Sequence, residues 1–248
     1  MTRLYKTLRK AMDKAVHLYD MIEEQDRILV GVSGGPDSLS LLKLLYDRYL
    51  FMDKCFSLLA VHVDLGFPQK EPLNRKLLKD YFEKLGVGYR IIQTQIQELA
   101  LDPKARKKPC FICSHNRRKK IYETANAEGC TKIAYGHHKD DIVETLLMNI
   151  LYSRKIEAMS PVQDVFKGEM QIIRPLAFIQ ESLIKKFAME AHLPLLPRLC
   201  PVDGHTRRQT IKEMISSLNE SEKKSNIREN IFKSLSHVNI KSDFHLSE

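Results

Sequence analysis

The chain has 248 residues, of which 43% are hydrophobic, and this length suits one α/β domain with an appendage or two small domains. Its longest apolar run is far too short to cross a membrane, and its basic first ten residues lack the apolar segment of a secretory signal, so we expect a cytoplasmic protein. A net charge of +9 favours an anionic partner, and nucleic acid is the commonest one.

Hydrophobic periodicity predicts alternating helices and strands over most of the chain. Residues 4–22 have helical periodicity, and the apolar run 28–32 predicts a first strand, followed by a helix that begins at Pro36. Further strands are expected at 57–63, 87–92 and 131–135, and further helices at 73–85, 114–128 and 140–152. Residues 99–109 are expected to form a polar loop. This alternation predicts an α/β fold with a doubly wound, Rossmann-like parallel sheet.

The pattern changes after residue 153. Segments 163–166 and 170–173 predict a β-hairpin, and helices are expected at 180–191, 206–218 and 222–236. We therefore expect three parts, namely an N-terminal helix (1–27), a nucleotide-binding α/β domain (28–176) and a C-terminal helical region (177–248).

The segment between the first strand and its helix, residues 33–38, reads Ser-Gly-Gly-Pro-Asp-Ser. The N–H groups of Gly34 and Gly35 can turn toward one point, where the positive end of the helix dipole also favours an anion. With the hydroxyls of Ser33 and Ser38, they predict a phosphate site, although the spacing fits neither a P-loop nor a dinucleotide motif. Asp37 either braces this loop or binds a Mg²⁺ ion that lies between the carboxylate and the phosphate.

Five cysteines, an odd number, argue against a disulfide framework in a reducing compartment and favour metal binding or catalysis. Cys110 and Cys113 form a Cys-x-x-Cys pair among basic residues at the start of a predicted helix. That setting predicts thiols that ionise readily. Cys55 and Cys130 adjoin apolar segments and are expected in the core.

Cys200 lies between prolines and is available as a third thiolate ligand. Three thiolates are one short of a four-cysteine metal site. Either a histidine, His115 or His205, completes the site, or the fourth position stays open to an exogenous ligand such as sulfide. A structural zinc site remains an alternative.

Two acidic positions follow predicted strands. Gly136-His-His-Lys-Asp-Asp141 closes the fourth strand and opens a helix, where acidic residues would stabilise any helix through its dipole. The functional interpretation places Asp141 on Mg²⁺ or ATP. His137 and His138 either contact phosphate or simply pack. Asp64 ends the second strand at the same edge of the sheet and is a weaker candidate for metal or base contact.

In order and spacing these motifs resemble the tRNA 2-thiocytidine synthetases (TtcA), a group of PP-loop ATP pyrophosphatases. The resemblance runs from Leu8 to about His237 and rests on segments 33–38, 109–118, 136–141, 173–176 and the residues around Cys200 and 208–212. It implies a PP-loop domain that binds ATP at 33–38, with Gly136 and His137 also at the nucleotide. It further implies a [4Fe–4S] cluster on Cys110, Cys113 and Cys200, with one iron free of protein ligands.

The activity that the resemblance implies is ATP-dependent tRNA thiolation. ATP would adenylate C2 of a tRNA cytidine, at position 32, and cluster-delivered sulfur would replace the oxygen. The three cysteines, Asp64 and Asp141 are the expected catalytic residues, with Mg²⁺ on Asp141.

The implied partners are tRNA and a sulfur donor, either a cysteine desulfurase or free sulfide, and a homodimer is compatible with the sequence. The basic runs 104–108, 117–120 and 207–208 would contact the tRNA backbone. Three alternatives remain, namely a 2-thiouridine synthetase, a lysidine-type tRNA ligase, and a zinc-containing nucleic-acid-binding protein with a vestigial ATP loop.

Overall fold

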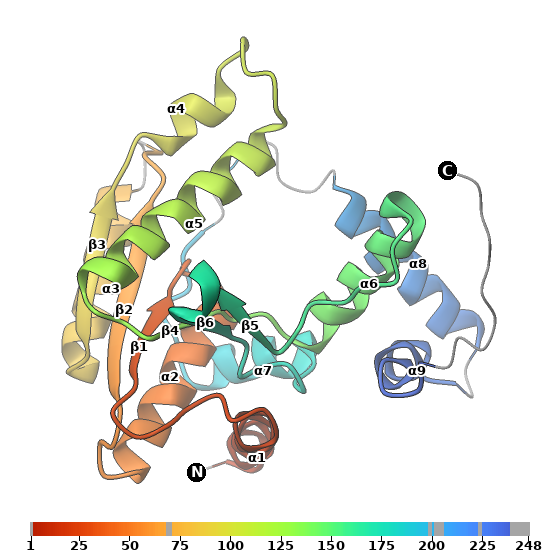
Figure 1. Cartoon of the computed structure of the whole chain (residues 1–248), viewed down its shortest axis with the longest axis horizontal. Helices are drawn as coiled ribbons and strands as arrows, with labels where there is room; N and C mark the ends of the chain where they lie inside the picture. Colours follow the sequence, from red (N-terminus) through yellow and green to blue (C-terminus); the bar gives the residue numbers. More distant parts are fainter. Residues whose placement is uncertain (1, 68–70, 198–199, 201–205, 223–224, 239–248) are drawn as a thin grey trace. The chain divides into compact units, whose positions relative to one another are not determined.

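The computed structural model describes residues 2–67, 71–197, 200, 206–222 and 225–238, and its centre is one six-stranded sheet (Figure 1). The strand order is β3-β2-β1-β4-β6-β5, and neighbours are parallel except β5 and β6. The strands are β1 Arg27–Gly31, β2 Ser57–Asp64, β3 Gly88–Gln93, β4 Lys132–Ala134, β5 Val162–Val165 and β6 Met170–Ile173. The predicted doubly wound α/β sheet is confirmed, and the predicted hairpin forms its antiparallel edge.

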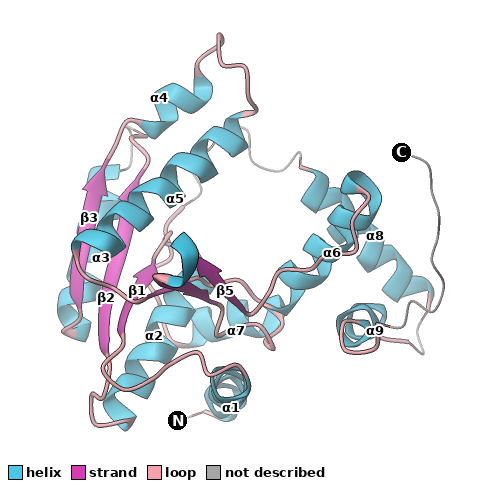
Figure 2. Ribbon diagram, viewed as in Figure 1, coloured by secondary structure: helices cyan, strands magenta, loops and turns pink. Residues whose placement is uncertain are grey.

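The helices of the described chain are shown in Figure 2. They are α1 Arg3–Leu18, α2 Pro36–Phe51, α3 Glu71–Leu85, α4 Ile96–Leu101, α5 Pro109–Ala127, α6 Lys139–Ser153, α7 Glu181–Glu190, α8 Arg207–Ser221 and α9 Ile227–Ser234, with a short 3₁₀ turn η1 at Phe166–Gly168.

Two sequence predictions about the segment between β3 and β4 are wrong. Residues 99–101 end a helix rather than begin a loop, because Ile96 and Ala100, four residues apart, share the buried face of α4. Helix α5 begins at Pro109 rather than Ser114, since the fixed φ of proline suits the first helical position. Cys110 and Cys113 therefore lie inside the helix, in its first turns.

Both faces of the sheet are covered by helices, as the continuous burial of residues 28–30 in β1 requires. Ile28 and Val30 pack in a core cluster with residues of α1, α2, α3 and α7. Leu29, which points to the opposite face, packs in a second cluster with residues of α4 and α5. The three central residues of the strand, 28–30, are therefore all apolar, as is typical of a parallel strand that is buried on both sides.

The topology of the sheet marks a ligand crevice between two particular strands. From β1 the chain moves outward to β2 and β3, then crosses back to β4 on the other side of β1. The connections that follow β1 and β4 thus diverge, and ligands of such sheets bind at this switch point. The two segments that start there begin at Val32 and Tyr135, directly before the predicted phosphate loop and Gly136.

The amino ends of β1 and β4 are joined by a buried ion pair. Lys132 Nζ lies 2.8 Å from Asp26 Oδ2, and both side chains are buried. Thr131 Oγ1 donates to Asp26 Oδ1 at 2.9 Å, and the Glu23 N–H donates to Oδ2 at 2.7 Å. Because the carboxylate is fully satisfied, the pair holds the two switch-point strands together without leaving an unpaired buried charge.

The chain divides into two compact units, residues 1–139 with 160–203 and residues 140–159 with 204–248. These units do not coincide with the three parts expected from the sequence. The difference arises because α6 packs with the C-terminal helices, through Val143 against Ile211 and Ile215. The described helices include none that is long and apolar enough to cross a membrane.

Candidate active site

The loop at residues 33–38 is closed by the hydroxyl of Ser38. Ser38 Oγ accepts the Ser33 N–H at 3.1 Å, donates to the Gly35 carbonyl at 3.2 Å and lies 3.1 Å from Ser33 Oγ. Gly35 is the N-cap of α2, and Pro36 is the first residue of the helix. The loop therefore turns at the amino end of a helix, where backbone N–H groups are available to an anion.

The segment that leads to Cys200 packs directly on this loop. Leu196 N–H donates to the Gly34 carbonyl at 2.9 Å. Gly34 has a φ of +85°, and a methyl group added there would lie 2.4 Å from Leu196 Cδ1. Glycine is thus required at this position both by its backbone conformation and by the close approach of Leu196.

The end of β4 meets the same loop from the other side of the switch point. A methyl group added at Gly136 would lie 2.8 Å from the carbonyl carbon of Asp37, so the two backbones are in contact. His138 is buried, and its Nε2 lies 3.8 Å from Asp37 Oδ1. The ring of His137 lies 5.6 Å from that of Tyr135. The structure therefore brings Gly136 and Asp37 together, with His138 rather than His137 facing the Asp37 carboxylate.

Asp64 lies at the end of β2 with its carboxylate engaged by protein groups. Oδ1 accepts the Gly66 N–H at 2.8 Å, and Oδ2 is paired with Arg75 of α3. The side chain is almost completely buried. In this arrangement Asp64 braces the turn after β2, and its direct role at the reacting atoms stays a prediction.

His62 connects β2 to the start of the phosphate loop. Its Nδ1 lies 2.8 Å from the Val32 carbonyl oxygen, so Nδ1 carries the proton, because a carbonyl can only accept. Nε2 is buried and has no hydrogen-bond partner among the described residues. Burial is the main cause that lowers the pKa of His62, and it outweighs the Val32 hydrogen bond and the Asp64 charge, which oppose it.

The lowered pKa of His62 predicts that the protein loses stability as the pH falls. The pKa of His62 in the folded protein lies below the ordinary value of about 6.5, which applies to the unfolded chain. The neutral His62 therefore contributes fully to the free energy of unfolding above pH 6.5, and this contribution is lost as the pH drops toward the folded pKa. We expect a loss of up to about 1.4 kcal/mol per pH unit in the free energy of unfolding. Urea titrations between about pH 7.5 and 5.5 will measure it.

The matched variant for this measurement is His62→Asn, whose amide can still donate to the Val32 carbonyl but does not titrate. Its stability should fall less steeply with pH than that of the wild type. Equal slopes for the two proteins would contradict the assignment of this pH dependence to His62.

Cys113 lies within electrostatic range of both Cys200 and Cys110 in the first compact unit. Cys110 is exposed, and Cys113 and Cys200 are half-buried. Burial is the main cause that raises the pKa of Cys113, the Cys200 thiolate raises it further, Arg117 opposes the rise, and Cys110 adds to it. The prediction that this thiol ionises readily is therefore wrong for Cys113, because partial burial and the interactions with Cys200 and Cys110 outweigh the opposing charge of Arg117.

The donor set nevertheless suits a thiolate-binding metal. Within the described ranges, no three His, Cys, Asp or Glu side chains are gathered closely enough to hold a metal ion. Negative charge on Cys200 and Cys110 disfavours ionisation of Cys113, and a bound metal cation would remove this repulsion by stabilising the thiolate ligands. His205, one candidate for a fourth ligand, lies outside the described residues, and the ring of His115 is stacked on that of Phe111. As expected, Cys130 is buried in the core and Cys55 is packed against it.

Asp141 belongs to the second compact unit, where the first turns of α6 face basic residues of α8 and α9. Arg208 is paired with Asp141 and also lies 3.7 Å from Glu144, and Arg228 is paired with the fully buried Asp140. The acidic side chains thus serve this unit as ion-pair partners. A Mg²⁺ ligand role for Asp141 stays a prediction, and Arg208 is less available to RNA than its position in a basic run suggested.

Three residues of the site were not predicted, namely His62, Arg75 and Leu196. His62 had a visible signal, since it is a polar residue inside an otherwise apolar strand segment. Arg75 and Leu196 had none, because each contacts a residue that is distant in the sequence.

Comparison with protein families supports the interpretation of the loop. Residues 4–198 match the family model described as a PP-loop domain. The fold is similar to that of the U34-tRNA thiolase NcsA from Methanococcus maripaludis, solved with its [4Fe–4S] cluster (TM-score 0.75, 22% identity, 95% of this chain and 80% of that chain). It is also similar to the NH3-dependent NAD synthetase from Campylobacter jejuni (TM-score 0.53, 16% identity, 96% of this chain and 93% of that chain).

Curated relatives are more similar in sequence. The tRNA-cytidine(32) 2-sulfurtransferase of Aliivibrio salmonicida is 39% identical over 219 residues, which are 87% of this chain and 70% of the relative. The enzyme of the same name from Pasteurella multocida is 37% identical over 217 residues, which are 86% of this chain and 68% of the relative. Both matches cover most of this chain. The chain therefore belongs to the PP-loop family and, within it, to the family of the tRNA-cytidine(32) 2-sulfurtransferases.

Proposed function

We propose that this protein is an ATP-dependent tRNA sulfurtransferase that replaces the C2 oxygen of cytidine 32 with sulfur, as the names of its relatives indicate. The observation that carries the proposal is the position of the segment before Cys200. Leu196 is hydrogen-bonded to Gly34 of the phosphate loop, and Cys200 acts electrostatically on Cys113. Coupled nucleotide and sulfur chemistry requires a third thiol that interacts with the Cys-x-x-Cys pair and follows, four residues later, a contact with the loop.

The ATP half of the reaction would use the loop and the end of β4. The N–H groups of Gly34 and Gly35 would bind phosphate, together with the hydroxyls of Ser33 and Ser38, which now hold the loop closed. Their fixed dipoles would stabilise charge as the base oxygen attacks the α-phosphorus and pyrophosphate leaves.

Mg²⁺ would share the neutralisation of the phosphates, since the loop contains no lysine. Asp141 is its predicted ligand, and binding would require the carboxylate to exchange Arg208 for the metal. Asp37 fits a bracing role better, because it faces His138 at 3.8 Å.

The thiols Cys110, Cys113 and Cys200 would hold the [4Fe–4S] cluster by three of its irons. When bound, the cluster would supply the sulfur that displaces AMP from the activated carbon. Arg117 would counter the negative charge of the cysteine ligands, as it already does at Cys113. A cysteine desulfurase or free sulfide would replenish the sulfur, and the proposal places the protein in the cytoplasm, active as a monomer or a homodimer.

The test is thiolation in vitro by anaerobically purified protein. We expect about four irons and four sulfides per chain, and ATP-dependent appearance of 2-thiocytidine in a tRNA transcript that carries cytidine at position 32. The matched control is the same transcript with uridine at position 32, which should remain unmodified. Mass spectrometry of the digested RNA gives the readout.

The same assay separates the alternatives. Thiolation of uridine alone would favour a 2-thiouridine synthetase, and lysine-dependent modification without sulfur would favour a lysidine-type ligase. One zinc per chain, no iron and no modified nucleoside would contradict the enzyme and favour a nucleic-acid-binding protein.

A further inference from the structure

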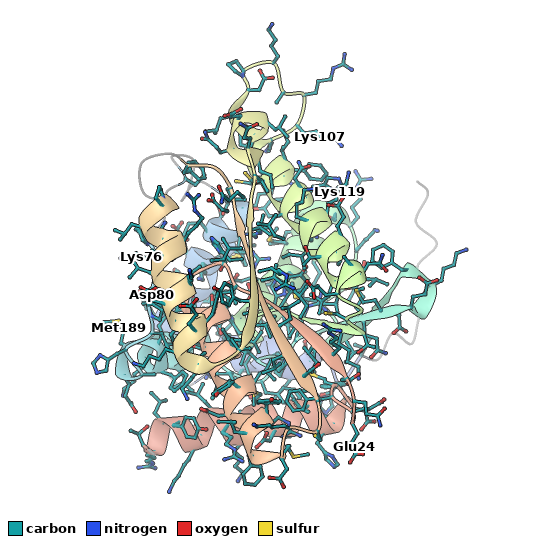
Figure 3. The ribbon with its side chains drawn as sticks, turned by 90° about the vertical axis from the view of Figure 1, so that its left-hand side faces the viewer. Glu24, Lys76, Asp80, Lys107, Lys119 and Met189 are labelled. Carbon is teal, nitrogen blue, oxygen red and sulfur yellow. The ribbon has the colours of Figure 1, made fainter. Side chains whose placement is uncertain are left out.

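Helix α5 carries a row of aromatic and basic residues that the proposed chemistry does not use. Phe111, His115, Arg118 and Tyr122 are spaced by four, three and four residues, so they share one side of the helix. We call these four residues, together with Lys107 before the helix, the α5 stripe. The stripe spans roughly 17 Å at the rise of an α-helix. In Figure 3, Lys107 lies just before the start of this helix and Lys119 lies on it.

The aromatic rings of the stripe are arranged as an open stack. The rings of Phe111 and His115 are nearly parallel (7°), with centroids 5.9 Å apart, and Lys107 Nζ lies 4.7 Å from the centroid of Phe111. Phe111 is 46% exposed although it is fully apolar. At the other end, Tyr122 meets the exposed ring of Phe166 edge to face at 5.2 Å. Phe111 and His115 are therefore exposed to solvent, whereas Tyr122 is half-buried and packs against the core cluster that contains Leu29.

We propose that the α5 stripe stacks unpaired bases of an RNA loop, a role that deepens the proposed function and rests on it. Unpaired bases splay out and stack on aromatic rings and guanidinium planes, which paired bases in a duplex cannot do. Lys107 and Arg118 would contact the phosphates that accompany those bases. Cys110 lies in the same first turn as Phe111, so the stacked bases would be neighbours of the nucleotide that reacts.

The charge of the surface favours RNA over a protein partner. The loop before the helix adds exposed Lys104, Arg106 and Lys108, and Lys119 is exposed beside Arg118. Centres of protein interfaces are depleted of charged residues, and lysine in particular is rare in them. Aromatic rings between basic side chains are instead what single-stranded nucleic acid requires.

The experiment compares RNA affinity of two Phe→Leu variants in the full chain with its cluster. Phe111→Leu keeps an apolar side chain but removes the flat ring. Phe51→Leu is the matched control, because Phe51 is also exposed (66%) and also lies under a cation, Arg9, at 4.1 Å. Fluorescence anisotropy would measure binding to a stem–loop with an unpaired seven-base loop, of about anticodon size, and to a duplex without unpaired bases.

We expect Phe111→Leu to bind the stem–loop about 5- to 100-fold more weakly and the duplex unchanged. Its salt dependence should equal that of the wild type, since no charge is lost, whereas Lys107→Gln should reduce the slope by about one. His115→Leu should weaken binding to the stem–loop in the same way, and Phe51→Leu should leave the affinity for both RNAs unchanged.

Unchanged affinity for the stem–loop in both Phe111→Leu and His115→Leu would overturn the stacking role. A loss of affinity for the duplex as large as the loss for the stem–loop would overturn it too. If these variants instead lose only the use of a protein sulfur donor, the stripe is a protein-docking surface and the proposal is wrong. Thiolation by the wild type is scored separately. Ring-dependent RNA binding without thiolation would support the stripe and contradict the proposed reaction.

Discussion

Cys200→Ala should abolish tRNA thiolation while the ATP-dependent release of pyrophosphate continues. The thiol of Cys200 is one of three predicted iron ligands, and its loss leaves the pair Cys110 and Cys113 with too few donors. Changes in residues that merely orient metal ligands cost 10- to 100-fold in metal affinity or activity, so the loss of a ligand should exceed about 100-fold in thiolation. The phosphate loop should retain its function, because the contact there is made by Leu196 and not by residue 200.

The readouts are 2-thiocytidine by mass spectrometry, pyrophosphate release, and iron per chain after anaerobic reconstitution. Cys55→Ala is the matched control, since Cys55 is a half-buried cysteine packed against the core. It should keep its iron and its thiolation. Full thiolation by Cys200→Ala would rule out a cluster with three cysteine ligands.

Gly136→Ala should remove ATP-dependent chemistry altogether. The added methyl group would lie 2.8 Å from the Asp37 carbonyl carbon, 2.9 Å from its oxygen and 3.0 Å from the Ser38 nitrogen. All three are backbone atoms at the start of α2, so the loop or β4 has to shift. A displacement of about 1 Å in a site of this kind costs roughly 100-fold in rate, and we expect a loss of that order in pyrophosphate release.

The control is Gly88→Ala in β3, where the added methyl group would meet Leu59 Cδ1 at 3.7 Å, an ordinary contact. Gly88→Ala should keep wild-type pyrophosphate release. Circular dichroism of both variants separates a displaced loop from a failure to fold. A folded Gly136→Ala protein with normal pyrophosphate release would show that the approach of β4 to the loop is unimportant for ATP.

Local sequence signals located most of the elements and the phosphate loop. The strand β1 and helix α2 follow from an apolar run, two glycines and a proline at the first helical position, and each of these acts over a few residues. The start of α5 was placed five residues too late, because the apolar periodicity is weak there and proline alone marks the boundary. Helix α4 was overlooked for a similar reason, since it is only six residues long.

The properties of the candidate site depend more on contacts between distant segments. The sequence could name Cys113 as a candidate ligand, but its raised pKa results from burial and from Cys200, 87 positions later. The basic neighbours of Cys113 in the sequence had suggested a lowered pKa instead. Asp64 and Asp141 were likewise recognisable as acidic residues after strands, whereas their partners Arg75 and Arg208 are set by helix packing.

The sequence by itself determined the order of strands and helices, the PP-loop motif and the family, because periodicity, turn chemistry and motif spacing are properties of short stretches of chain. Only the tertiary structure decided that Leu196 lies on Gly34, that Gly136 touches Asp37, and that α6 packs with the C-terminal helices. Such contacts depend on how whole elements pack. The free energy of that packing is summed over many residues, and no single local pattern encodes it.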